Sequence, residues 1–60
     1  MKIISQFEAA TRSTTELHGL FKEAFSAFAA APRGSEERRH ALNSLENIEA
    51  ELASRTPHHQ

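Results

Sequence analysis

Apolar residues recur at heptad spacing over the first half of the chain, and this pattern limits the fold to packed helices. The steps alternate between four and three residues, which is the a and d spacing of helices that pack along one seam. The seam comprises Ile3, Phe7, Ala10, Thr14, Leu17, Phe21, Ala24 and Phe28. A second line at steps of seven lies beside it: Ile4, Thr11, His18 and Phe25. No proline occurs between Lys2 and Ala31, so the pattern predicts one helix over about residues 2–31.

A polar stretch at residues 11–15 leaves a second interpretation open. Ser13 with Glu16 three residues later fits a capping box, which would begin a new helix there. Serine and threonine are also poor helix formers. We favour the continuous helix because the apolar register passes through the stretch without a change of phase. In the alternative, the chain breaks near Thr11–Thr15 and the residues before it fold back over the rest as a short third helix.

The segment "APRGS" at residues 31–35 predicts the end of the first helix and the start of another. Proline disfavours a helical conformation in the residue before it, and Gly34 allows backbone angles that other residues avoid. Ser35 is a good N-cap, and two glutamates follow it in the first turn. We therefore predict a turn at 32–35, a second helix over about 36–55 and a flexible tail at 57–60. The apolar positions of the second helix form one stripe: Ala41, Leu42, Leu45, Ile48 and Leu52.

These elements predict an all-α fold, an antiparallel helical hairpin in a single domain over residues 1–56. A continuous first helix would extend beyond the second, which leaves its apolar start without a partner in the same chain. A chain of 60 residues without cysteine needs further support, and self-association is the simplest source. We expect a homodimer that forms a four-helix bundle. The expected oligomer or partner interface comprises Ile3, Ile4, Phe7, Thr14, Leu17, Phe21, Phe25, Phe28, Leu45, Ile48 and Leu52.

Composition narrows the classes of function. Seven basic and eight acidic residues give a formal net charge of −1, whereas nucleic-acid binders generally carry a basic excess. No apolar run reaches the ~18 residues of a membrane span, so we expect a soluble, unprocessed, cytoplasmic protein. The four histidines have no metal-ligand spacing and cysteine is absent, so no metal or cofactor is predicted. No nucleophile is paired with a base, which indicates that the protein is not an enzyme.

Two further readings concern binding. Arg33, Ser35, Arg38 and Arg39 gather at the start of the second helix, where free backbone N–H groups and guanidinium groups could hold an anion. An ordinary capped turn with solvated arginines explains them equally well.

The function that size and composition favour is a small oligomeric regulator or inhibitor, of phage, plasmid or bacterial accessory type. It would act by contact with another protein through an amphipathic helical face.

One family resemblance bears on the same residues. The stretch "TTELHGLFKEA", followed by a turn and "RRHALNSLENIEAELASRTP", resembles the helical-hairpin proteins of phages that sequester cyclic-oligonucleotide immune signals. The resemblance covers about the last 45 residues and implies a symmetric oligomer with nucleotides bound between subunits. It would make Arg38, Arg39 and Lys22 the phosphate contacts. RNA-binding hairpin dimers share this architecture, so RNA binding is a further alternative.

Overall fold

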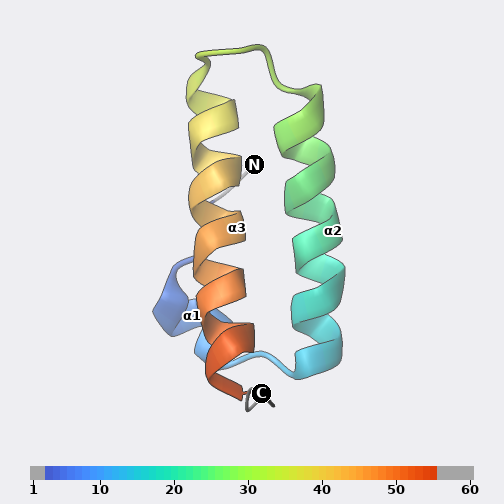
Figure 1. Cartoon of the computed structure of the whole chain (residues 1–60), viewed down its shortest axis with the longest axis vertical. Helices are drawn as coiled ribbons and strands as arrows, with labels where there is room; N and C mark the ends of the chain where they lie inside the picture. The colour runs from blue at the N-terminus through green and yellow to red at the C-terminus, as the bar shows by residue number, and fades with distance from the viewer. Residues whose placement is uncertain (1–2, 56–60) are drawn as a thin grey trace, which may run out of the picture.

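The computed structural model describes residues 3–55, and these form three helices. They are α1 (Gln6–Ala10), α2 (Thr14–Ala30) and α3 (Glu36–Arg55). Helices α2 and α3 lie side by side as an antiparallel hairpin, and α1 packs against α3 near the open end of that hairpin (Figure 1). The prediction of an all-α fold is confirmed, and α3 covers the residues expected for the second helix.

The predicted continuous helix over residues 2–31 is wrong, because the chain breaks between Thr11 and Ser13. The Thr11 hydroxyl donates to the Glu8 carbonyl at 2.7 Å at the end of α1. Ser13 has extended backbone angles, and its hydroxyl accepts the Glu16 N–H at 3.1 Å. The Glu16 carboxylate in turn accepts the Ser13 N–H at 3.0 Å, which completes a capping box. Side-chain oxygens thus satisfy backbone groups that a continuous helix would have paired with one another.

The start of the chain folds back on α3, so the predicted unpartnered overhang is also wrong. The Ile4 N–H donates to the hydroxyl of Ser44 at 2.9 Å, and the Asn47 side-chain amide donates to the Ile4 carbonyl at 2.8 Å. The Ile4 side chain is buried within its own chain, whereas Phe7 is 84% exposed on the outer side of α1. The fold-back alternative therefore describes the structure, and the original reason for expecting a dimer does not hold.

The core is small and lies where the three helices meet. Leu17 of α2 and Ile48 of α3 are fully buried at its centre, together with Ile4 and Ala9 from the folded-back segment. Partly buried apolar residues pack around these four: Leu20, Phe21 and Leu52. Burying one such aliphatic side chain stabilises a fold by roughly 1.5–3 kcal/mol. Few residues therefore supply most of the hydrophobic stabilisation.

Arg38 closes the turn end of the hairpin. Its guanidinium lies 4.0 Å from the centre of the Phe28 ring and donates to the carbonyls of Phe28 and Ala31 at 3.3 and 3.2 Å. These are carbonyls at the C-terminus of α2, where a cation is favoured by the helix dipole. Gly34 supplies the left-handed backbone angle of the turn, with φ of 76°, and the Ser35 hydroxyl caps α3.

Arg55 closes the opposite end, where all three helices meet. Its guanidinium pairs with the Glu51 carboxylate at 2.9 Å. It also donates to the carbonyls of Ala9 and Ala10, both at 3.2 Å, and to the Thr14 hydroxyl at 3.3 Å. One side chain at the end of α3 therefore binds the last residues of α1 and the first residue of α2.

Candidate interaction surface

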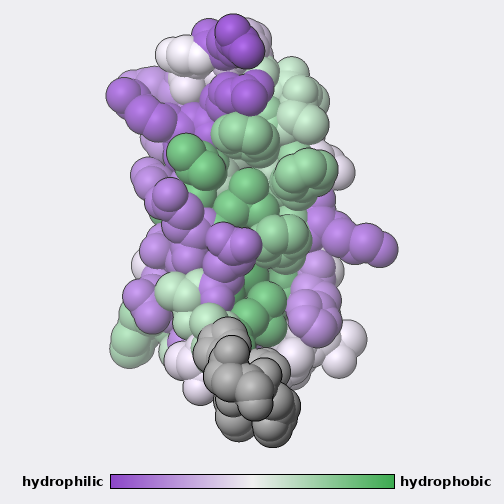
Figure 2. Space-filling view, in the orientation of Figure 1, coloured by the Kyte–Doolittle hydropathy of each residue, from purple (hydrophilic) through white to green (hydrophobic). Residues whose placement is uncertain are grey.

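One side of the α2–α3 hairpin is covered by the folded-back segment, and the other side is open. Figure 2 shows the open side, where apolar surface extends between the two helices and hydrophilic side chains flank it. We call this surface the front face. Four of its residues line its grooves, Phe21 and Phe28 of α2 with Leu42 and Leu52 of α3. It also includes Phe25 of α2 and Leu45, which helical spacing places on the same face of α3 as Leu42 and Leu52.

The exposed apolar side chains of the front face lie in the half near the turn. Phe25 is 56% exposed and Leu42 is 41% exposed, although both belong to the apolar stripes that form the hairpin. Phe21, Phe28 and Leu52 are half-buried, and Leu45 is buried. Extended exposed apolar patches are typical of interaction sites, so the front face is the candidate interaction surface of this chain.

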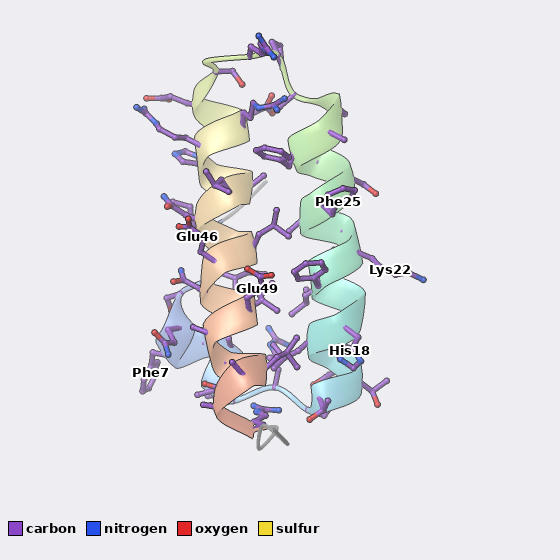
Figure 3. All side chains as sticks on the ribbon, viewed as in Figure 1. Phe7, His18, Lys22, Phe25, Glu46 and Glu49 are labelled. Carbon is purple, nitrogen blue, oxygen red and sulfur yellow. The ribbon has the colours of Figure 1, made fainter. Side chains whose placement is uncertain are left out.

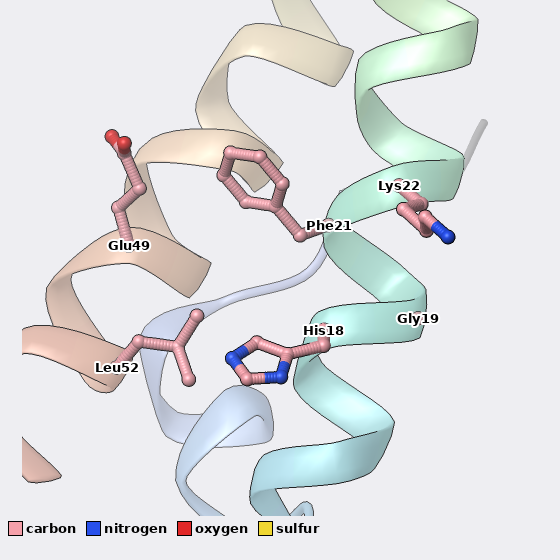
Figure 4. A pocket seen from close by; sticks show the side chains of 6 residues that line it. All are labelled: His18, Gly19, Phe21, Lys22, Glu49 and Leu52. Atoms are coloured by element: carbon pink, nitrogen blue, oxygen red, sulfur yellow. The ribbon is translucent and has the colours of Figure 1, made fainter.

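The part of the front face toward the open end of the hairpin contains a shallow groove of about 600 Å³, the lower groove. The residues that line it are His18, Gly19, Phe21, Lys22, Glu49 and Leu52. The rings of His18 and Phe21 extend from α2 toward α3, and Leu52 faces them from α3 (Figure 4). A Cβ atom at Gly19 would meet nothing within 4 Å, so no contact within the chain requires a glycine there.

A second groove, of about 310 Å³, lies at the turn end. The residues that line it are Phe28, Gly34, Ser35, Arg38, Arg39 and Leu42. It brings together three of the four residues predicted to bind an anion, without Arg33. Two of the three already have partners: the Arg38 guanidinium caps α2, and the Ser35 hydroxyl caps α3. Arg39 is exposed.

Charged residues of opposite sign stand on the two edges of the front face. Figure 3 shows Lys22 extending outward from α2, Glu46 extending outward from α3, and Glu49 in front of α3. The ion pairs within residues 3–55 are Glu8 with Arg12 and Glu51 with Arg55, so Lys22, Glu46 and Glu49 form none in the described part of the chain.

The structure divides the predicted interface residues among four places. Ile4, Leu17 and Ile48 belong to the core, whereas Phe7 lies on the outer surface of α1 and Ile3, which precedes α1, is 39% exposed. Thr14 is exposed at the start of α2 and accepts a hydrogen bond from Arg55. The front face contains the other five: Phe21, Phe25, Phe28, Leu45 and Leu52. Sequence reasoning placed Leu42 in the apolar stripe but not in the interface, and it missed Lys22, Glu46 and Glu49 as its charged edges.

Within residues 3–55, no three acidic or histidine side chains gather in a way that would hold a metal ion. No helix in this described part of the chain is both long enough and apolar enough to cross a membrane. Comparison with protein-family models, with curated proteins and with solved structures finds no match to this chain.

Proposed function

We propose that this chain is a small non-enzymatic regulator or inhibitor that acts by protein–protein contact, and that it works as a homodimer. Two hairpins would pack through their front faces and form a four-helix bundle. The outer surfaces of that bundle, including the surface of α1 that carries Phe7, would remain available to a different protein.

The exposure of the front face is the observation that supports this proposal. A hairpin of this size has little core, and it leaves Phe25 56% exposed and Leu42 41% exposed on the side that α1 does not cover. Covering that side would bury apolar area that the single chain leaves exposed, which is the dominant favourable contribution to most protein association. The support comes from the open face and no longer from an overhanging helix end.

Sedimentation and light scattering of two phenylalanine variants test the proposal. Phe25→Asp puts a charge into the front face and should shift the protein from dimer to monomer. Phe7→Asp makes the same chemical change at a more exposed phenylalanine outside the front face and should leave the mass unchanged. A wild-type chain that is a folded monomer at micromolar concentration would contradict the proposal, as would a dimer that Phe25→Asp leaves intact.

A second candidate function is suggested by the groove at the turn end, the upper groove, where an aromatic ring and two arginines lie together. An anti-defence protein that binds cyclic oligonucleotides between subunits would use this combination, since arginine binds phosphate and aromatic rings stack on bases. This second function predicts that cyclic di- or trinucleotides raise the melting temperature of the protein and that Arg39→Ala abolishes the rise. Arg39 is the better variant because Arg38→Ala would also remove the cap of α2. The same assay with RNA tests the RNA-binding alternative.

A further inference from the structure

The front face differs between its two ends, and this difference restricts how a second copy can cover it. Phe28 and Leu42 share the upper groove, near the turn, and Phe21, Lys22, Glu49 and Leu52 share the lower groove. Phe25, the most exposed apolar residue of the front face, lies between these levels on α2. The two exposed apolar side chains, Phe25 and Leu42, therefore lie in the half near the turn, where Arg38 and Arg39 also line the groove. Lys22 and Glu49 lie toward the open end.

Two symmetric arrangements place one front face on another. With the two-fold axis parallel to the helices, both turns lie at the same end of the bundle and α2 of each subunit packs on α3 of the other. With the axis perpendicular to the helices, the turns lie at opposite ends, and each helix packs on its own copy. Both are isologous, so each residue contact occurs twice or lies on the axis.

The apolar residues favour turns at the same end. In that arrangement, residues at similar distances from the turn face one another across the two subunits. Phe25 would therefore lie near Leu42 of the partner subunit, and these two exposed apolar side chains would cover each other. With turns at opposite ends and the helices in full overlap, Phe25 would face the level of His18 and Lys22, and Leu42 would face the level of Glu49. That pairing would bury apolar side chains against charged ones, which costs free energy.

The charged edges favour the same arrangement. Lys22 is the central residue of α2, and Glu46 lies next to the centre of α3. With turns at opposite ends, Lys22 would face its own copy, and Glu46 would face its own copy. With turns at the same end, the α2 edge of one subunit meets the α3 edge of the other, so lysine meets glutamate (Figure 3). Like charges placed together disfavour an arrangement, and opposite charges select its alternative.

We propose that a second copy of this chain covers the front face with its turn at the same end, so that α2 of each subunit lies on α3 of the other and Lys22 faces Glu46 of the partner subunit. This arrangement rests on the self-association proposed above and specifies its geometry.

Cross-linking tests the arrangement directly because the chain has no cysteine of its own. Lys22→Cys and Glu46→Cys are made separately and treated with a short bifunctional maleimide, each alone and mixed in equal amounts after subunit exchange. We expect a covalent dimer in the mixture and little from either variant alone. Glu23→Cys is the matched control, since residue 23 is adjacent in sequence but lines a groove on another side of α2 with Arg12, Glu16, Gly19 and Leu20. Its mixture with Glu46→Cys should not cross-link.

Charge reversal gives an independent measurement. Lys22→Glu and Glu46→Lys should each weaken dimerisation about tenfold at low salt, because two contacts per dimer become repulsive. The double variant should restore the wild-type dissociation constant. With turns at opposite ends, the double variant would again place like charges together and would gain nothing.

The outcomes separate this inference from the proposed function. Self-cross-linking of Lys22→Cys, or a dimer whose mixture gives no cross-link, would overturn the same-end arrangement and leave self-association intact. A wild-type chain that sediments as a monomer would overturn both.

Discussion

Removing the guanidinium of Arg55 should destabilise this fold far more than its place near the end of the last helix suggests. Methionine at this position keeps an unbranched apolar stem and removes every donor. The four groups that would lose a partner are the Glu51 carboxylate, the carbonyls of Ala9 and Ala10 and the Thr14 hydroxyl. Arg55→Met therefore weakens the attachment of α1 to α3 and the start of α2 in one step, while the hydrogen bonds of Ile4 to Ser44 and Asn47 remain.

The expected loss follows from these contacts. A hydrogen bond from a charged group contributes roughly 1.5–3 kcal/mol when it is well shielded. The Arg55 side chain is 24% exposed, and its bonds share one guanidinium, so they do not add fully. We expect the free energy of unfolding to fall by about 2–3 kcal/mol. For a domain of this size that corresponds to a melting temperature roughly 10–20 °C lower.

The chain offers a matched control in its other i,i+4 glutamate–arginine pair. Arg12 lies 3.8 Å from Glu8, and the two side chains are 44% and 34% exposed. Such an exposed pair contributes about 0–0.5 kcal/mol, so Arg12→Met should change stability little. The difference between Arg55→Met and Arg12→Met thus isolates the bonds that Arg55 makes to α1 and α2.

Urea unfolding at fixed protein concentration measures both variants, and limited trypsin digestion supplies a local readout. Cleavage after Arg12, in the connection between α1 and α2, should accelerate in Arg55→Met relative to cleavage after Arg33 in the turn. Equal losses of stability in Arg55→Met and Arg12→Met, or an unchanged rate of cleavage after Arg12, would refute the reasoning.

Two further predictions concern the folded-back segment and the break before α2. Ser44→Ala should lower the free energy of unfolding in urea by about 1–3 kcal/mol, because it leaves the buried Ile4 N–H without a partner. Ser54→Ala, at an exposed serine, is the control and should change this free energy by less than about 0.5 kcal/mol. Equal effects of the two variants would contradict the docking of Ile4. The Ser13 N–H, which the Glu16 carboxylate accepts, holds the pKa of that carboxyl below its ordinary value. The ionised Glu16 carboxylate therefore stabilises the fold above pH ~4.3, and this stabilisation is lost as the pH falls through the lowered pKa. In acid unfolding followed by circular dichroism, Glu16→Gln should reduce the loss of stability over this pH range.

The sequence predicted the hairpin because its signals there are local and agree with one another. Pro32, Gly34 and Ser35 mark the turn, and regular apolar stripes continue on either side of it. The break before Ser13 was harder to predict, because two local signals disagreed. The capping box was correct, and the unbroken heptad register was misleading.

The seam does not continue into the core across the break, because its residues before the break, Ile3, Phe7 and Ala10, are exposed in the structure. Ile4 and Ala9 approach Ile48 from the folded-back segment, and Leu17 approaches it from α2. The residues that pack on the core before the break are therefore not the ones that carry the heptad spacing in the sequence. Periodicity alone therefore does not distinguish a long helix from two helices that share a partner.

The open face could be predicted only in part for a related reason. The apolar stripes identify Phe21, Phe25, Phe28 and Leu45 as the apolar side of the hairpin helices, but they do not say which of these residues another segment of the chain covers. Which side of the hairpin stays open depends on where residues 3–10 dock. That choice depends on Ser44 and Asn47, two polar residues of α3 whose binding of a backbone segment has no pattern in the sequence.

The two sides of the hairpin thus differ in how they can be covered. The covered side has polar side chains at the contact, and Ser44 and Asn47 bind both backbone groups of Ile4. Hydrogen bonds of this kind fix one register, because a shifted segment would leave buried polar groups without partners. The front face has apolar side chains between the helices and Lys22 and Glu46 at its edges, so in the proposed dimer burial would supply the affinity and charge would supply the orientation. A contact built in this way suits the association of separate chains, and the polar side suits a segment of the same chain that must dock in one position.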